Sequence, residues 1–314
     1  MKQKLIIHID KNHPCLIEGL KKLGYKNHED YSSDIQNILD KIKNYYGLVI
    51  RSRFSIDKKF IDKAKNLNFI ARVGSGTENI DVEYAISRNI TVINAPEGNK
   101  DAVGEHAIGM LLNLTNKLGR ANESIKKGNW NREKFRGFEI KGKTVGIIGY
   151  GNMGKSFAEK LKGFDCNLIC YDIKKNIGDS NCKQVSLNEI KKESEILSLH
   201  VPLSSSTLNI INKDFINEMK SAFWLINTAR GNLISTANLV EGLRSKKILG
   251  AGLDVLEYES SSLESISIDK KPKNSLNYLL KAKNVILSPH IAGWTYESHK
   301  KLAKVILKKI KKFL

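Results

Sequence analysis

The sequence predicts an α/β protein made of two Rossmann-like or flavodoxin-like domains with parallel sheets. Short apolar runs alternate with helical patterns in two series, one over the first 95 or so residues and one from about residue 143. A glycine-rich turn follows the first strand of the second series directly. Alternating strand and helix signals are typical of parallel sheets covered by helices, and 314 residues suffice for two such domains.

In the first series, apolar runs predict short buried strands at residues 5–9, 47–50, 69–73 and 91–93. Apolar residues at helical spacing predict helices at residues 14–23 and 35–42. A long helix is expected from Asp101 to Leu118, with apolar residues on more than one side. Such a helix usually contacts more than one body, so we expect it to join two domains or two subunits.

The second series predicts six strands, at residues 144–148, 167–171, 196–199, 223–227, 250–255 and 284–287. A basic amphipathic helix is expected at residues 296–313, and a long loop at 260–274. We expect residues 98–287 to form a cofactor domain, inserted into a discontinuous substrate domain of residues 1–97 and 288–314. The active site is expected in the cleft, where domain closure would exclude water.

Composition narrows the class of protein. The formal net charge is +19, but the lysines are scattered, which favours a solvated basic surface over a nucleic-acid interface. No apolar run is long enough to span a membrane and no signal-peptide pattern is present, so a cytoplasmic location is expected. The four cysteines form no CxxC pair and have no His cluster beside them, so we expect reduced thiols and no metal site.

The turn Gly149-Tyr150-Gly151-Asn152-Met153-Gly154 has the GxGxxG pattern of dinucleotide-binding sites. Gly149 would permit the tight turn, Gly151 would let the backbone approach a diphosphate, and Gly154 would let helix and strand pack closely. Asp172 directly follows the next strand, where a carboxylate would bind the adenosine ribose hydroxyls. The pattern therefore predicts NAD, in preference to NADP.

Three more segments follow strands of the second series, and they hold Arg230, Glu259 and His290. A histidine can take a proton from a hydroxyl group or return it, and a carboxylate beside it fixes the tautomer. An arginine can bind a substrate carboxylate through two parallel hydrogen bonds. Each residue also has a structural alternative, as a helix cap, a surface acid or a core histidine. Together they predict hydride transfer coupled to proton transfer.

With these segments, the chain resembles the D-isomer-specific 2-hydroxyacid dehydrogenase family, and within it the phosphoglycerate dehydrogenase branch. The resemblance covers nearly the whole chain. Besides the segments above, it rests on Val49-Ile50-Arg51-Ser52, Arg72-Val73-Gly74-Ser75-Gly76, Gly98-Asn99, Gly104-Glu105-His106 and His200-Val201-Pro202-Leu203. Three features depart from the family pattern: Ser260 stands in place of a usual proline, residues 260–284 form a long segment, and Trp294 replaces a residue that is commonly small.

The resemblance implies a site of defined composition. Glu259, in preference to Glu257, would be the catalytic glutamate beside Arg230 and His290, while His106 and His200 would be structural. Cofactor contacts are implied for Ser75, Asn152, Met153, Asp172, Val201, Pro202, Thr228, Ala229, Asp254 and Gly293. Substrate contacts are implied for Arg51, Ser52, Arg72, Ser75, Gly76 and Asn99, in addition to Arg230 and His290.

The implied activity is NAD-dependent oxidation of a D-2-hydroxy acid, with 3-phosphoglycerate and serine biosynthesis as the first expectation. Arg51, with Arg53 as a second candidate, would bind the phosphate, although both could be solvated loop charges. Alternatives are a glyoxylate or hydroxypyruvate reductase, another D-2-hydroxyacid dehydrogenase, and an NAD(H)-sensing protein of the corepressor type. We also expect a homodimer and no C-terminal regulatory domain.

Overall fold

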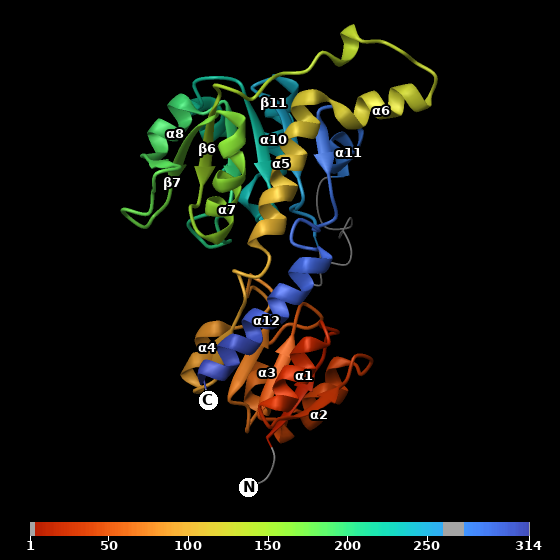
Figure 1. The fold of residues 1–314 in the computed structure, drawn as a ribbon, viewed down its shortest axis with the longest axis vertical. Helices are drawn as coiled ribbons and strands as arrows, with labels where there is room; N and C mark the ends of the chain where they lie inside the picture. Colours follow the sequence, from red (N-terminus) through yellow and green to blue (C-terminus); the bar gives the residue numbers. More distant parts are fainter. Residues whose placement is uncertain (1–3, 260–272, 314) are drawn as a thin grey trace. The chain divides into compact units, whose positions relative to one another are not determined.

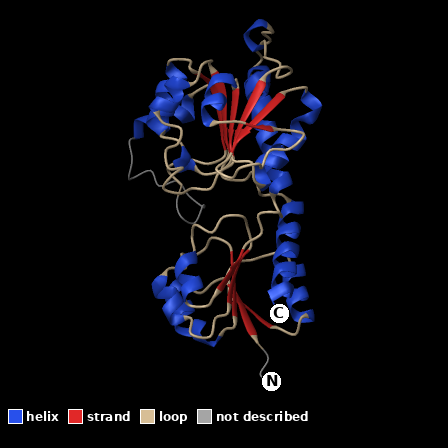
Figure 2. Cartoon of the chain, turned by 90° about the vertical axis from the view of Figure 1, so that its left-hand side faces the viewer, coloured by secondary structure: helices blue, strands red, loops and turns tan. Residues whose placement is uncertain are grey.

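The computed structural model describes residues 4–259 and 273–313. They fall into two compact units, each with its own parallel sheet (Figures 1 and 2). The five-stranded unit holds residues 4–100 and 294–313, and the seven-stranded unit holds residues 101–259 and 273–293. The predicted fold class is therefore confirmed. The boundaries at residues 97/98 and 287/288, and the roles assigned to each side, stay predictions.

The sheet of the five-stranded unit has the order β2-β1-β3-β4-β5, and every pair is parallel. Its strands are β1 (Leu5–His8), β2 (Lys26–Glu29), β3 (Gly47–Ile50), β4 (Phe69–Arg72) and β5 (Thr91–Ile93). Helices α1 (Cys15–Lys22) and α12 (Tyr296–Phe313) share one core with the sheet, and α2 (Ile35–Lys41), α3 (Lys58–Lys63) and α4 (Val82–Ser87) share another. Because both faces are covered, the inner strands are apolar at successive positions.

Strand β2 is absent from the sequence-based prediction, and its composition explains why. Its residues Lys-Asn-His-Glu carry no apolar side chain, and it lies at the sheet edge with β1 as its one partner. An edge strand gains its ladder hydrogen bonds from the neighbouring backbone, which no hydropathy pattern reveals.

The sheet of the seven-stranded unit has the order β12-β11-β10-β9-β6-β7-β8, again all parallel. Its strands are β6 (Thr144–Ile148), β7 (Asn167–Tyr171), β8 (Lys183–Gln184), β9 (Ile196–Leu199), β10 (Phe223–Asn227), β11 (Ile248–Leu253) and β12 (Val285–Leu287). Helices α5 (Lys100–Asn116) and α7 (Asn152–Leu161) share one core with it. On the other face lie α8 (Leu187–Glu193), α9 (Lys213–Glu218), α10 (Thr236–Arg244) and α11 (Lys273–Lys281).

The helix expected from Asp101 to Leu118 is shorter than predicted. Helix α5 ends at Asn116 because Lys117 adopts the left-handed conformation, with φ +57°, and α6 (Leu118–Lys126) begins after it. Short 3-10 turns lie at Ile42–Asn44, Glu133–Phe135, Lys162–Phe164 and Gly231–Leu233. Most of the loop expected at residues 260–274 lies outside the described residues, and its last two residues already belong to α11.

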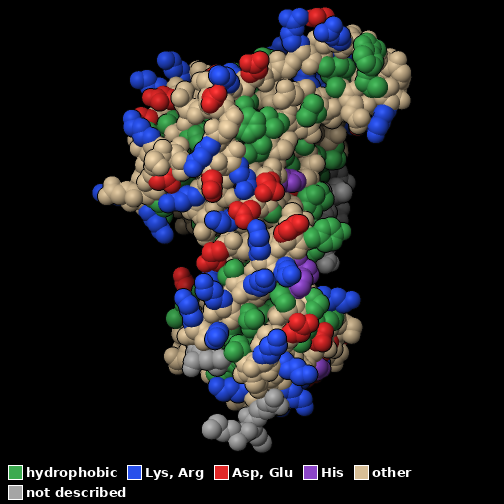
Figure 3. All heavy atoms as spheres, viewed as in Figure 1, with side chains coloured by type: hydrophobic (Ala, Val, Ile, Leu, Met, Phe, Trp, Pro, Cys, Tyr) green, Lys and Arg blue, Asp and Glu red, His purple; other side chains and the backbone are tan. Residues whose placement is uncertain are grey.

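The surface and the thiols add little to the functional argument. Figure 3 shows Lys and Arg interspersed with Asp and Glu on the face in view. In residues 4–259 and 273–313, no helix is long and apolar enough to cross a bilayer. Over the same ranges, no group of three or more His, Cys, Asp and Glu could hold a metal ion. The four cysteines are free thiols.

Candidate active site

The predicted site residues of the seven-stranded unit gather at one edge of its sheet. They follow β6, β7, β9, β10, β11 and β12, and the carboxyl ends of parallel strands all lie at the same edge. The chain runs outward from β6 through β7 to β8, then returns to place β9 on the other side of β6. Ligands of open α/β sheets bind at such a reversal of strand order.

The glycine turn after β6 has the geometry that its sequence predicts. Gly149 has φ +91°, and a Cβ atom there would lie 2.7 Å from the carbonyl carbon of His200. At Gly154 a Cβ atom would lie 2.1 Å from the carbonyl oxygen of Gly149, so close packing excludes any side chain. A Cβ atom on Gly151 would meet nothing within 4 Å. The space before the first turn of α7 is therefore open, and the free N–H groups of that turn suit a diphosphate.

Asp172 directly follows β7 and is held in place by backbone donors. Its carboxylate accepts hydrogen bonds from the N–H groups of Tyr150, at 2.8 Å, and Lys174, at 2.9 Å. Each oxygen keeps a further lone pair, which suits the two hydroxyls of a ribose. Thr228, after β10, carries a buried Oγ1 with no hydrogen-bond partner. Buried hydroxyls normally have a partner, so this one indicates a place where a ligand supplies it. The donor set at this edge therefore fits a dinucleotide.

His290 and Glu259 form a contact pair at the same edge. Nδ1 of His290 lies 2.8 Å from Oε2 of Glu259, and both side chains are about one-fifth exposed. The other oxygen of Glu259 accepts the N–H of Leu256 at 2.6 Å, which fixes the carboxylate. Because Glu259 engages Nδ1, the tautomer with a proton on Nδ1 is favoured, and Nε2 is left as the atom that can exchange a proton.

The structure separates the two candidate glutamates. Glu257 accepts hydrogen bonds from the backbone N–H of Thr236, at 3.2 Å, and from its hydroxyl, at 2.7 Å, at the start of α10. Glu257 therefore serves the amino terminus of a helix, while Glu259 contacts His290. Arg230 follows β10 and is half-buried, with one guanidinium nitrogen donating to the carbonyl of Ala229 at 2.6 Å.

Asp254 holds the segment that carries His290. Its buried carboxylate accepts the Ser288 hydroxyl at 2.5 Å and the N–H groups of Ile291 and Ala292, each at 2.8 Å. Its carbonyl accepts the N–H of His290, whose φ is +56°. These contacts make Asp254 the anchor of the segment that carries His290. The cofactor contact implied for it stays a prediction.

In the five-stranded unit, the predicted substrate residues follow β3, β4 and β5, which are neighbours in the sheet. The hydroxyl of Ser75 donates to Oδ1 of Asn99 at 2.5 Å, and Asn94 donates to the carbonyl of Ser75 at 2.7 Å. Arg51 and Ser52 directly follow β3, and Ile50 pairs with Arg72 across the ladder. The sheet thus brings the predicted set, Arg51, Ser52, Arg72, Ser75, Gly76 and Asn99, to one edge.

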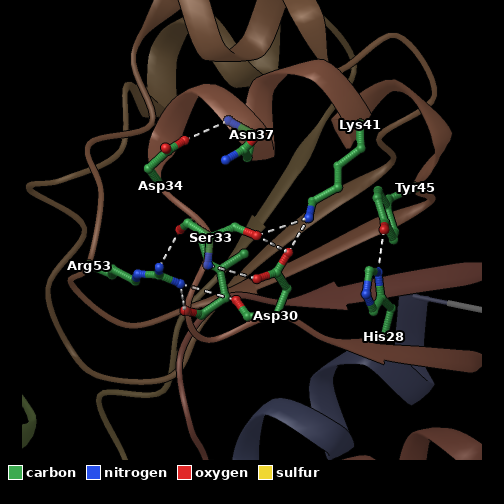
Figure 4. A network of polar contacts seen from close by, with 9 residues as sticks. His28, Asp30, Ser33, Asp34, Asn37, Lys41, Tyr45 and Arg53 are labelled. Atoms are coloured by element: carbon green, nitrogen blue, oxygen red, sulfur yellow. Dashed lines mark hydrogen bonds and ion pairs between the residues drawn. The ribbon is translucent and has the colours of Figure 1, made fainter.

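Arg53 has a different role from the one predicted. Its guanidinium donates to the carbonyls of Ile9, at 3.0 Å, and Asp30, at 3.1 Å, and also to that of Ser33 (Figure 4). These three backbone acceptors engage the guanidinium, whereas the sequence predicted a cation free to bind phosphate. Lys41 and Ser33 bind the side chain of Asp30. Burial opposes its ionisation, yet these hydrogen bonds outweigh burial and hold the pKa of Asp30 well below its usual range.

Comparison with known proteins agrees with this geometry. Residues 108–292 match the model of the "D-isomer specific 2-hydroxyacid dehydrogenase, NAD binding domain". A hydroxypyruvate reductase of Thermotoga maritima is 35% identical over 98% of this chain and 96% of its own length. The chain belongs to the D-isomer specific 2-hydroxyacid dehydrogenase family. The predicted resemblance and the expected NAD cofactor are confirmed.

Other members of the family show how far the similarity extends. A D-3-phosphoglycerate dehydrogenase of Methanocaldococcus jannaschii is 37% identical over 89% of this chain. The chain spans 52% of that relative, about half of its length. The solved D-lactate dehydrogenase of Aquifex aeolicus, complexed with NAD and lactic acid, superposes with a TM-score of 0.84 at 28% identity, covering 99% of this chain and 95% of its own.

His106 and His200, which the sequence predicts to be structural, each contact a serine hydroxyl. The ring of His200 contacts the Ser198 hydroxyl at 2.8 Å, and burial lowers the pKa of His200 to about 3, so the ring is neutral. Nε2 of His106 lies 2.9 Å from the Ser288 hydroxyl, which itself binds Asp254. Sequence reasoning gave neither Ser288 nor Asp254 a positioning role, because their partners come from other strand ends and no local pattern marks them.

Replacing Glu259 by glutamine is expected to lower kcat for alcohol oxidation, because an amide beside Nδ1 cannot balance the positive charge that His290 gains when it accepts the hydroxyl proton. Steady-state kinetics at a single pH measure the effect. The Glu257→Gln variant is the matched control, and its kcat should stay close to that of the wild type. A loss of kcat in Glu257→Gln together with wild-type turnover in Glu259→Gln would contradict the assignment.

Proposed function

We propose that this protein oxidises 3-phosphoglycerate to 3-phosphohydroxypyruvate with NAD, a reaction of serine biosynthesis. One observation carries the choice of a phosphorylated substrate. Arg51 is half-buried, and among the described residues no carboxylate lies within ion-pair distance of its guanidinium. A desolvated arginine without a protein anion suits an anionic ligand. The five-stranded unit would be the substrate domain and the seven-stranded unit the cofactor domain.

The protein residues would divide the work as follows. Arg230 would bind the substrate carboxylate through its guanidinium fork. Nε2 of His290 would accept the proton of the α-hydroxyl group, while Glu259 stabilises the resulting charge through Nδ1. The cofactor, when bound, accepts the hydride released from the α-carbon. In the reverse direction the same histidine would return its proton to the substrate oxygen.

The cofactor would be held by residues at the carboxyl edge of the seven-stranded sheet. The turn at Gly149, Gly151 and Gly154 would hold the diphosphate, and Asp172 would accept the ribose hydroxyls. Thr228 would offer its unpartnered hydroxyl. The contacts implied for Ser75, Asn152, Met153, Val201, Pro202, Ala229, Asp254 and Gly293 belong to the same proposal.

A reductase acting on hydroxypyruvate or glyoxylate is the second candidate. It is favoured by the Thermotoga maritima relative, which matches this chain along 96% of its length and is named hydroxypyruvate reductase. The deciding experiment is a spectrophotometric panel of 3-phosphoglycerate, D-lactate, glyoxylate and hydroxypyruvate with NAD(H) and NADP(H). The highest kcat/KM on 3-phosphoglycerate supports the proposal. No turnover of any of these substrates would favour the NAD(H)-sensing alternative.

Replacing Arg51 by alanine is expected to cost roughly 1.5–3 kcal/mol in kcat/KM for 3-phosphoglycerate, because a charge-assisted contact to the phosphate is lost. Turnover of glyoxylate, which has no phosphate, should change little. Arg88→Ala is the matched control, since Arg88 is about half exposed on the same unit and pairs with Asp62. An equal loss on both substrates would assign Arg51 to the shared carboxylate or to the fold.

We also propose a homodimer, built on α5 and its neighbours. Helix α6 exposes Leu118 and Ile125, and the segment after it exposes Trp130 and Phe138. Exposed large apolar side chains that recur along one segment of the chain are typical of interfaces. Light scattering at micromolar concentration should give twice the chain mass, and Trp130→Glu should lower it. Ile86→Glu, at an exposed site on the other unit, is the control. A monomeric wild type would contradict the proposal.

A further inference from the structure

The side chain of Arg51 is stacked as well as half-buried. Its guanidinium carbon lies 3.9 Å from the centroid of the Trp294 ring, and both residues belong to the five-stranded unit. Its backbone is fixed separately, because its N–H donates to Oδ2 of Asp10 at 2.5 Å and its carbonyl accepts from Asn79 at 3.3 Å. The main chain and the side chain of Arg51 are therefore held by different partners.

The electrostatics around Arg51 leave its charge available. Burial lowers the pKa of the guanidinium and Asp10 opposes that effect, so the side chain stays a cation. A ring that covers one face of the guanidinium leaves the N–H groups in its plane free for other acceptors. Asp10 is occupied by the Arg51 backbone. Within residues 4–259 and 273–313, no carboxylate forms a direct ion pair with the guanidinium, so an anion from outside the protein would complete this arrangement.

Trp294 also contacts a histidine of the same unit. Its ring centroid lies 6.3 Å from that of His299, whose ring in turn meets His13 edge-on at 5.6 Å. Burial lowers the pKa of His299, and the charges of Arg51 and His13 lower it further. A neutral His299 does not repel the Arg51 cation. Trp294 itself is 59% exposed, which is unusual for a tryptophan whose task is core packing.

We propose that Trp294 is a positioning residue for substrate specificity: it holds the Arg51 guanidinium flat, so that two of its N–H groups bind the phosphate at the end of the substrate away from the reacting carbon. This inference rests on the proposed function, and it concerns the residue that orients Arg51. A free arginine side chain populates many rotamers, and binding an anion would then require ordering them. Stacking on Trp294 supplies that order before the ligand arrives.

The test compares Trp294→Ala and Trp294→Phe on two substrates, with kcat and KM measured separately. Trp294→Ala should raise KM for 3-phosphoglycerate about three- to tenfold, the range expected from a lost cation–π contact, with kcat within about twofold. Its constants for glyoxylate should stay at the wild-type values. Trp294→Phe keeps a ring and should retain most of the affinity. Tyr296→Ala is the control, because Tyr296 is 95% exposed two residues away.

A double-mutant cycle shows whether Trp294 acts through Arg51. In an Arg51→Ala background, Trp294→Ala should cause no further loss on 3-phosphoglycerate, because the residue that it positions is gone. Fully additive losses, or an equal loss of affinity for both substrates in the single variant, would overturn the inference. A thermal melt of each variant reports any general loss of stability.

The inference and the proposed function can fail separately. If the wild type does not prefer 3-phosphoglycerate, the proposed function fails, and inorganic phosphate becomes the probe. It should then inhibit glyoxylate reduction by the wild type, and inhibition should be several-fold weaker in Trp294→Ala. Inhibition that is absent, or equal in both proteins, would overturn the inference. If 3-phosphoglycerate is preferred but Trp294→Ala behaves as the wild type, only the inference fails.

Discussion

Replacing His290 by alanine is expected to lower kcat by about 10²–10⁴-fold in both directions, because one group serves as base for oxidation and as acid for reduction. Cofactor binding should survive, since the glycine turn and Asp172 lie after other strands. Turnover is followed by NADH absorbance, and binding by NADH fluorescence in the absence of substrate.

The backbone at His290 requires a second variant. Its φ of +56° lies in the left-handed region, which alanine adopts only with strain and asparagine tolerates better. His290→Asn should lose activity as severely as His290→Ala while melting close to the wild type. His28→Ala is the matched control, because His28 lies on the edge strand β2 and contacts Tyr45. Turnover near the wild-type rate in His290→Asn would remove this residue from the mechanism.

Asp254→Asn is expected to destabilise the protein by about 2–4 kcal/mol, because an amide NH₂ would face one of the buried donors that the carboxylate now accepts. We also expect kcat to fall at least tenfold, since the same donors hold the segment on which His290 is placed. Thermal unfolding and steady-state kinetics measure the two effects. Asp34→Asn is the control, because asparagine is an equally good cap at the start of α2.

This experiment also tests the cofactor contact implied for Asp254 by resemblance to the family. A positioning residue should change kcat and the unfolding temperature together, with the dissociation constant for NADH changing little. A variant that melts like the wild type and binds NADH weakly would favour the cofactor contact instead. The buried position of Asp254, 1% exposed, supports the first outcome.

Much of the fold follows from local patterns because both sheets are covered on both faces. Runs such as 47–50 and 196–199 are largely apolar, and the structure has strands with those bounds, β3 and β9, buried at every position. The polar edge strand β2 has no such signal. The helix predicted through Leu118 breaks at Lys117 without a proline or glycine there, so its end could not be predicted from the residues around it.

The candidate site likewise has features that the sequence predicts and features that it does not. The glycine turn was predictable because Gly149 and Gly154 each answer a steric requirement set by residues nearby in the chain or on the adjoining strand. The role of Arg53 was not, because its three carbonyl acceptors belong to Ile9, Asp30 and Ser33, which are 20 or more positions distant in sequence. A charge beside a predicted site shows only that a cation is present, and its partners decide whether it is available.

The fold class, most strand positions and the glycine turn can be predicted from the sequence, because these depend on periodicity and short-range sterics. The residues suited to proton transfer are named by the sequence as candidates only. The tertiary structure alone decided that Glu259 contacts His290 while Glu257 binds the start of α10. It also decided that Asp254 anchors the histidine segment and that Arg51 stacks on Trp294, 243 positions away in the chain. Such contacts depend on which strand ends adjoin and where each side chain points. Folding sets both, because the residues in contact are far apart in the sequence.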